Sequence, residues 1–140
     1  MLIVPRPLVE EIIAHCRSRY PKEACGLLAA SPPATDHVVV QVYPMRNVED
    51  SPVGYSMDPK EQLLVEKQMR QRGQRLIGIF HSHTATEAYP SPVDVSLAIS
   101  PDVSYVLVSL QHHAQPAFKS YRIEGPTITP EPVQIISPQG

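Results

Sequence analysis

Leu76-Ile77-Gly78-Ile79-Phe80 is the stretch of sequence on which the fold prediction rests. None of its side chains is polar, so a strand built from it would turn no polar face toward water. Strands that are apolar on both faces lie at the centre of sheets that are covered on both sides. The polar residues 82–90 that follow predict a loop. We therefore expect a central strand over residues 76–80.

Helices and strands alternate on both sides of this segment. Apolar spacing and capping residues predict helices from residue 8 to about residue 20, from 59 to 72 and from 92 to 98, with an Asp58–Glu61 capping box at the second. Short apolar stretches predict strands at 2–4 (an edge strand), 25–30, 38–43, 105–110 and 117–124, and one or two edge strands within 127–136. Interleaved elements of this kind indicate an α/β (α+β) fold with a mixed sheet.

The length and composition of the chain indicate one globular domain. Its 140 residues are 42% hydrophobic, and we assign residues 1–136 to the domain and 137–140 to a C-terminal tail. A net charge of −2 argues against a nucleic-acid partner. The apolar runs are far shorter than the ~20 residues of a membrane-crossing helix, and residues 1–11 lack the features of a signal peptide. Only two cysteines are present, which favours the cytoplasm.

Two histidines, His81 and His83, directly follow the apolar segment. Residues at i and i+2 of an extended chain point to the same face, so the two imidazoles can converge on one ion. Asp94 falls in the first turn of the next expected helix, and a short loop can fold that turn back over the strand end. Two imidazoles and one carboxylate suit zinc and leave a fourth position for water, which is typical of a catalytic site.

The same residues also have structural interpretations. His-x-His pairs are common without a metal. The segment Ser91–Asp94 is explained by a serine N-cap, a proline at the first helical position and an aspartate in the first turn, a role that is compatible with metal binding. Cys25 is conceivable as a nucleophile, but its apolar neighbours favour a buried, unreactive thiol.

The complete spacing, His81-x-His83 followed after seven residues by Ser91-x-x-Asp94, resembles the JAMM motif of MPN+ metalloproteases. The resemblance implies the JAMM/MPN (cytidine-deaminase-like) architecture, in which helices flank a mixed, mostly antiparallel sheet. It also implies one Zn²⁺ per chain, bound by His81, His83 and Asp94, with Ser91 stabilising the oxyanion. It assigns the general base and acid to Glu23, which no physical pattern singles out among the 14 acidic residues.

Segments 81–91, 105–109, 120–123 and 131–133 are similar to the bacterial Mec-type branch of this family. The resemblance implies a peptidase that cuts after the C-terminal Gly-Gly of a small ubiquitin-like sulfur-carrier protein and releases cysteine, in cysteine biosynthesis. The expected loop over the site offers three candidate substrate contacts: Thr84, Glu87 and Tyr89. The alternatives are a JAMM protease that removes a ubiquitin-like modifier or other C-terminal residues, and a non-catalytic MPN scaffold.

Overall fold

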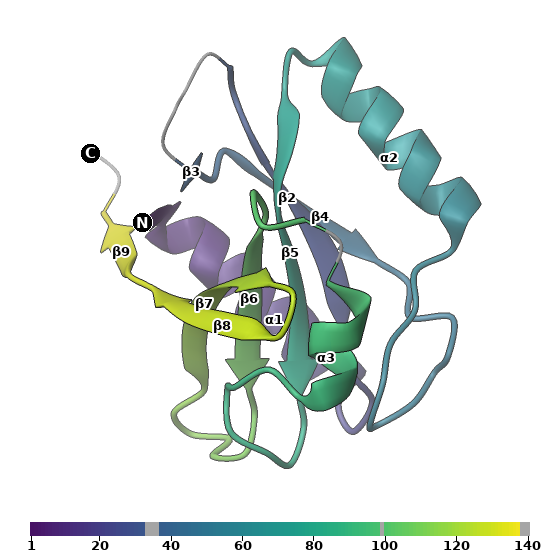
Figure 1. The fold of residues 1–140 in the computed structure, drawn as a ribbon, viewed down its shortest axis with the longest axis vertical. Helices are drawn as coiled ribbons and strands as arrows, with labels where there is room; N and C mark the ends of the chain where they lie inside the picture. Colours follow the sequence, from purple (N-terminus) through teal and green to yellow (C-terminus); the bar gives the residue numbers. More distant parts are fainter. Residues whose placement is uncertain (33–36, 99, 138–140) are drawn as a thin grey trace.

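The computed structural model describes residues 1–32, 37–98 and 100–137, and it has the mixed α+β organisation that the sequence predicts (Figure 1). Of the expected tail, residues 138–140 lie outside the described residues. Within the described ranges, no helix is long and apolar enough to cross a membrane. In chain order the elements are β1 (Leu2–Pro5), α1 (Arg6–Arg19), β2 (Cys25–Ala30), β3 (His37–Val38), β4 (Gln41–Met45), α2 (Pro59–Gln71), β5 (Arg75–His83), α3 (Pro92–Leu97), β6 (Ser104–Ser109), β7 (Ala117–Glu124), β8 (Thr127–Glu131) and β9 (Val133–Ile136).

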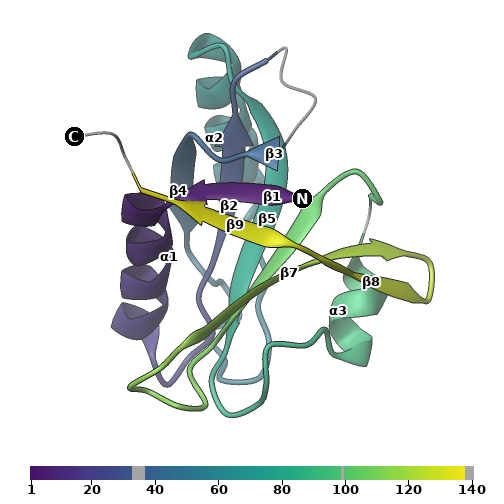
Figure 2. The ribbon, with the colours of Figure 1, turned by 90° about the vertical axis from the view of Figure 1, so that its left-hand side faces the viewer.

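The larger sheet contains six strands in the order β4-β2-β5-β6-β7-β8. All neighbours in it are antiparallel except β5 and β6, which run parallel and are joined by a crossover that contains α3. β5 is a central strand, as its apolar sequence predicts. A second sheet, β3-β1-β9, is parallel throughout. Figure 2 shows β1 and β9 side by side, crossing the strands of the larger sheet.

Apolar side chains fill the space on both faces of the larger sheet. On one face, Val9 and Ile12 of α1 belong to the same buried cluster as Leu28 and Phe80. On the other face, Met69 of α2 packs with the β2 and β4 side chains, and α3 packs against β6 and β7. Burial on both faces gives β5 a rigid backbone, which is the support that a catalytic site at its end requires.

β5 extends three residues beyond the expected end, so both histidines lie in the strand. His81 is paired with Cys25 of β2 and Leu107 of β6, and His83 is paired with Ser109. Ser82 is fully buried, and its hydroxyl accepts a hydrogen bond from the Ala24 amide at 2.8 Å. The predicted loop 82–90 therefore begins two residues later, at residue 84, because partners on both sides satisfy the polar groups of Ser82 and His83.

Three other predictions are corrected. The expected strand 38–43 is split, because the amide of Val39 bonds to Ile3 of the smaller sheet while the amide of Val40 bonds to Ala29 of the larger one. The expected edge strand at residues 2–4 is instead the centre of the smaller sheet. Asp58 caps α2, but the carboxylate of Glu61 accepts from the amide of Arg46 and so does not close a capping box.

Gly26 marks the closest approach of β2 to its neighbours. A Cβ atom there would collide with the ring of Phe80, which is fully buried, and would lie 2.7 Å from the carbonyl oxygen of Tyr43. We expect Gly26→Ala to lower the free energy of unfolding by about 1–3 kcal/mol, the usual cost of overpacking. Urea denaturation of the two proteins measures this difference, and equal midpoints would contradict it.

The buried carboxylate of Glu131 on β8 is expected to make the stability of the protein depend on pH. Its side chain is buried, and its oxygens accept from Ser120 Oγ at 2.7 Å and from Arg122 Nε at 2.9 Å. Burial opposes its charge, but hydrogen bonds from Ser104, Ser120 and Arg122 outweigh burial and lower the pKa of Glu131. The contribution of this carboxylate to the free energy of unfolding is therefore complete above the pKa of about 4.3 that a glutamate has in the unfolded chain. It is lost as the pH falls through the lower pKa of the folded protein.

We therefore expect acid to destabilise the wild-type protein more than the Glu131→Gln variant. The comparison is the change in unfolding free energy of each protein between about pH 6 and about pH 3. Because the glutamine cannot ionise, the difference between the two changes isolates the contribution of this one carboxylate. Equal changes would contradict the prediction.

Candidate metal centre

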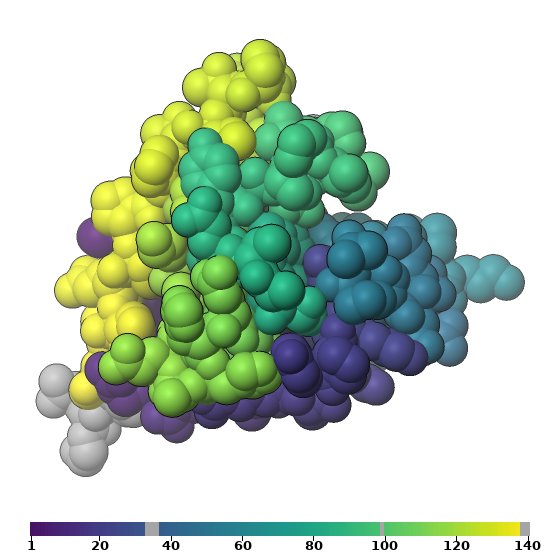
Figure 3. Space-filling view, turned by 90° about the horizontal axis from the view of Figure 1, so that it is seen from below, coloured from purple at the N-terminus to yellow at the C-terminus, as the bar shows by residue number. Residues whose placement is uncertain are grey.

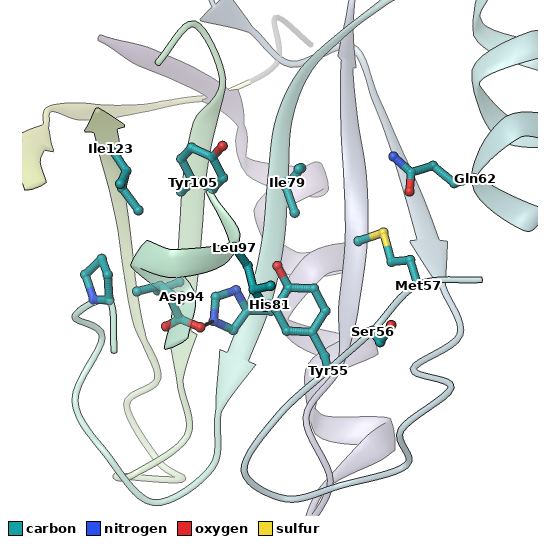
Figure 4. A pocket seen from close by; sticks show the side chains of 12 residues that line it. Tyr55, Ser56, Met57, Gln62, Ile79, His81, Asp94, Leu97, Tyr105 and Ile123 are labelled. Atoms are coloured by element: carbon teal, nitrogen blue, oxygen red, sulfur yellow. Dashed lines mark ion pairs between the residues drawn. The ribbon is translucent and has the colours of Figure 1, made fainter. Parts of the chain in front are cut away.

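Three side chains from two elements meet at the end of β5. Nε2 of His81 lies 3.1 Å from Oδ1 of Asp94, and Nε2 of His83 lies 3.0 Å from Oδ2 of the same carboxylate. Figure 4 shows His81 of β5 and Asp94 of α3 pointing toward each other. One potential ligand atom from each residue lies within 4.8 Å of the others, an arrangement that no other group of three His, Cys, Asp or Glu forms in residues 1–32, 37–98 and 100–137. The predicted convergence is confirmed.

The start of α3 fixes the carboxylate. The Ser91 hydroxyl accepts from the Asp94 amide at 3.1 Å, and the Asp94 side chain accepts from the Ser91 amide at 2.8 Å, which closes a capping box. The same carboxylate faces both histidines. The capping interaction of Asp94 is therefore compatible with the predicted ligand role, and the Ser91 amide holds the carboxylate in the orientation that faces the imidazoles.

The hydrogen bonds of the histidines fit a cation between them and Asp94. His83 Nδ1 lies 2.9 Å from the carbonyl oxygen of Glu87, which can only accept, so Nδ1 carries the proton. In the neutral ring, Nε2 then presents a lone pair to a carboxylate oxygen, so this contact is favourable only with a proton or a metal cation between the two atoms. His81 Nε2 is buried without a hydrogen bond of acceptable geometry. A histidine fixed through one nitrogen is typical of zinc ligands.

The charges of the three groups depend on each other. Burial lowers the pKa of His81, which favours the neutral form that binds metals. Burial also opposes charge on His83, but hydrogen bonds to Asp94 and the Glu87 carbonyl outweigh it and raise the pKa of His83. For Asp94, the attraction of the two nearby imidazoles outweighs burial and lowers the pKa of the carboxyl well below its usual value.

Glu23 lies between α1 and β2, and its backbone is fixed by a 2.8 Å hydrogen bond from its amide to Ser51. Its side chain is buried, and burial raises the pKa of Glu23 to about 7, with smaller contributions from Asp94 and Glu49. Its carboxylate makes no hydrogen bond or ion pair with any residue that the structure describes. A buried carboxylate that titrates near neutral pH is suited to move a proton in either direction.

Two hollows meet at the three potential ligands. Figure 3 shows the surface hollowed between the green segment that includes α3 and the blue segment before α2. The apolar hollow, of about 270 Å³, is lined by His81 together with mostly apolar side chains (Figure 4). The acidic hollow, of about 360 Å³, is lined by Glu23, Glu49, His83 and Ser91. Asp94, Tyr55 and Leu97 line both hollows.

The sequence profile described as prokaryotic homologues of the JAB domain matches residues 5–124. The chain belongs to this JAB-domain family. The match spans the segment from α1 to β7 and includes every residue of the candidate metal centre. The predicted membership of the JAMM/MPN group is thereby confirmed.

Characterised JAB-domain proteins and solved structures resemble this chain over most of its length. The CysO-cysteine peptidase of Mycobacterium tuberculosis is 43% identical over 136 residues, covering 97% of this chain and 92% of that protein. A probable TtuB-protein conjugate cleaving protease of Thermus thermophilus is 39% identical over 99 residues, covering 70% of this chain and 64% of that protein. The solution structure of a Desulfitobacterium hafniense protein matches with a TM-score of 0.88 at 41% identity, covering 100% of this chain and 94% of that protein.

A further solved structure shares the fold. It is described as a JAMM metalloprotease-like zinc site in the proteasome and signalosome, and it matches with a TM-score of 0.61 at 17% identity. The match covers 97% of this chain and 98% of the other. The predicted JAMM/MPN architecture of this JAB domain is therefore confirmed.

Two residues beside the centre were not predicted from the sequence. The Tyr55 ring stacks on the His81 imidazole, with 4.5 Å between ring centroids and 28° between planes, and so restrains the plane of that imidazole. Asn47 uses its whole amide: Nδ2 donates to the carbonyls of Glu23 and Gly54 at 3.0 and 2.9 Å. Its Oδ1 accepts from the amides of Glu49 and Ser56, both at 3.1 Å. Asn47 therefore ties Glu23 to the loop that carries Tyr55.

Asn47→Asp keeps the shape of the side chain but removes both N–H donors of its amide. The new carboxylate would face two carbonyl oxygens, so we expect the free energy of unfolding to fall by about 1–3 kcal/mol. We also expect kcat to fall about 10- to 100-fold, because Glu23 loses its fixed position, while zinc content stays the same. Steady-state kinetics with elemental analysis measure both quantities, and a wild-type kcat would contradict the prediction.

The candidate substrate contacts lie in three different environments. Thr84 is buried, lines the acidic hollow and donates to the Pro52 carbonyl at 3.0 Å. Glu87 offers its carbonyl to His83, and Tyr89 packs edge-to-face on Tyr121 and lines neither hollow of the site. Cys25 is fully buried, and burial raises the pKa of its thiol to about 12, as expected for an unreactive residue.

Proposed function

We propose that this protein is a zinc-dependent peptidase that hydrolyses the amide bond after the C-terminal Gly-Gly of a small ubiquitin-like sulfur carrier and releases cysteine, a step of cysteine biosynthesis. The observation that carries the proposal is the convergence of His81, His83 and Asp94 where the apolar hollow meets the acidic hollow that Glu23 lines. The 43% identity to a CysO-cysteine peptidase supports the carrier and the released residue. A cytoplasmic location belongs to the same proposal and is supported by the two free cysteines, Cys16 and Cys25.

His81, His83 and Asp94 would hold one Zn²⁺ per chain. A zinc ion bound by such a set lowers the pKa of a bound water toward ~7 and polarises the scissile carbonyl. The protein contributes two neutral imidazoles and one anionic carboxylate, which keep part of the positive charge of the ion available for the reaction. The burial of both imidazoles and the partial burial of Asp94 reduce competition from bulk water.

Glu23 would transfer the proton, and Ser91 would donate a hydrogen bond to the developing negative charge. Glu23 would take a proton from the attacking water and pass it to the leaving amine, for which a pKa of about 7 is suitable. The Ser91 hydroxyl accepts from the Asp94 amide, and its own proton has no acceptor among the described residues. That proton is free to be donated to the oxyanion.

The position of Glu23 sets the direction of the substrate. The leaving amine must lie beside the group that protonates it, and Glu23 lines the acidic hollow but not the apolar one. The side chain of the released residue therefore extends into the acidic hollow, where Thr84 is the best placed of the three candidate contacts. The carrier tail enters through the apolar hollow, and its glycines fit a narrow channel because they have no side chains.

A second candidate function is the removal of a ubiquitin-like modifier from lysine side chains. The acidic hollow favours it, because Val53 and Val93 at its edge are 86% and 61% exposed and leave it open to a larger leaving group. The Thermus relative, a probable conjugate cleaving protease, supports it as well. A non-catalytic scaffold is disfavoured by the complete set of potential ligands.

The test is an assay of two carrier adducts followed by mass spectrometry, one with a C-terminal cysteine and one joined to a lysine side chain. We expect cysteine release that stops on addition of a chelator, together with one zinc per chain by elemental analysis. Cleavage of the lysine conjugate alone would establish the second candidate. An intact cysteine adduct after incubation with zinc-loaded protein would overturn the main proposal.

A further inference from the structure

A third hollow, of about 630 Å³, lies beside the candidate centre and is lined by cationic side chains. We call it the basic hollow; it is bounded by the end of α1, the segment before β2 and the segment after β4, and Arg19, Lys22 and Arg46 line it. Glu23 lines both the basic hollow and the acidic hollow. The proposed proton donor therefore stands where the two hollows meet.

Two of the three cations in the basic hollow have no partner among the residues that the structure describes. Lys22 pairs with Asp50 at 2.6 Å on the surface. The guanidinium groups of Arg19 and Arg46 make no hydrogen bond or ion pair with any residue in the described ranges. Guanidinium groups bind carboxylates through two parallel hydrogen bonds, so these two arginines offer an unused site for an anion of that shape.

The acidic hollow lacks such a partner. Its charged lining consists of Glu23, Glu49 and Asp94 beside His83, and no lysine or arginine lines it. A residue released from a C-terminus carries an α-carboxylate two bonds away from the leaving nitrogen. With the charge of Asp94 offset by a bound zinc, the acidic side would still present the carboxylate of Glu49 to it, whereas the basic side would present two guanidinium groups that attract it.

We propose that the basic hollow binds the α-carboxylate of the residue that the reaction releases, through Arg46 and Arg19. The inference rests on the proposed peptidase function. Arg46 is well placed because it directly precedes Asn47, whose amide bonds to the Glu23 carbonyl and so fixes the chain beside the leaving nitrogen. The site selects a free C-terminal residue over an amide within a chain or on a lysine.

The experiment compares two substrates: the carrier–cysteine adduct with a free carboxylate, and the same adduct with a C-terminal carboxamide. We expect kcat/KM of the wild-type protein to be about 10- to 100-fold higher for the free acid, the usual effect of hydrogen bonds to a charged group. An Arg19→Met, Arg46→Met double variant should hydrolyse the two substrates at equal kcat/KM. Arg46→Lys should keep part of the preference, because it retains the charge but not the two parallel hydrogen bonds.

Arg70→Met is the matched control, since Arg70 is an exposed arginine on α2 that lines none of the three hollows. It should retain the full preference for the free acid. Equal cleavage of the two substrates by the wild-type protein, or a preference that survives in the double variant, would overturn the inference while leaving the peptidase function in place. Failure of the zinc-loaded wild-type protein to cleave either substrate would overturn the proposed function, and this inference with it.

Discussion

Glu23→Gln is expected to reduce kcat about 100- to 10,000-fold while one zinc per chain stays bound. The glutamine keeps the size and the hydrogen-bonding capacity of the side chain but cannot accept a proton from water. Because Glu23 is not among the three potential ligands, metal content should not change. Single-turnover kinetics on the carrier–cysteine adduct, with elemental analysis of the same sample, measure both quantities.

Glu49→Gln is the matched control for this prediction. Glu49 lines the same acidic hollow and contributes to the raised pKa of Glu23, so its replacement also removes one negative charge from the site. We expect a change in kcat of less than about tenfold, because Glu49 affects the proton transfer only through its charge. A Glu23→Gln protein with normal turnover would show that another group serves as the base.

Asp94→Ala is expected to remove both zinc and activity. The substitution deletes the carboxylate that both imidazoles face and also opens the capping box of α3. Loss of an outer partner of a metal ligand typically costs 10- to 100-fold in metal affinity, and loss of a ligand itself should exceed about 100-fold. Zinc titration with a competing chelator measures the affinity.

Ser91→Ala separates the two roles of the Asp94 segment. It removes the hydroxyl half of the capping box, at a cost of about 1 kcal/mol in stability, but keeps the backbone amide that bonds to the Asp94 carboxylate and deletes no potential ligand. We expect it to bind zinc like the wild-type protein and to lose about 100- to 1,000-fold in kcat, as expected for a donor to the oxyanion.

Normal zinc affinity in Asp94→Ala would rule out the proposed ligand set.

The sequence predicts the parts of the site that depend on local pattern. Both faces of residues 76–80 are apolar, which places β5 at the centre, and the spacing of His81 and His83 predicts their shared face. Asp94 is predictable because Ser91 marks a helix start ten residues after the strand segment. The role of Glu23 is predicted only through the family resemblance, since the position of its side chain depends on how the segment between α1 and β2 folds.

The remaining features depend on contacts between distant parts of the chain. The smaller sheet joins residues 2–5 to 37–38 and 133–136, and no local pattern records such pairing. The polar residues at the end of β5 resemble a loop until their partners on β2 and β6 are known. Asn47 and Tyr55 lie in a segment without periodicity, so only their contacts show their importance.

The parallel pairing of β5 with β6 determines where this architecture can vary. Parallel neighbours require a connection that returns to the end at which the first strand began, so the connection between β5 and β6 starts at the candidate site and includes α3, which packs on one face of the sheet. Insertions in that connection would alter the surface presented to a protein substrate without shifting the register of any strand. Diversification of substrate choice is therefore separable from the arrangement of the imidazoles, and grafting longer connections here is a direct route to hydrolases with new targets.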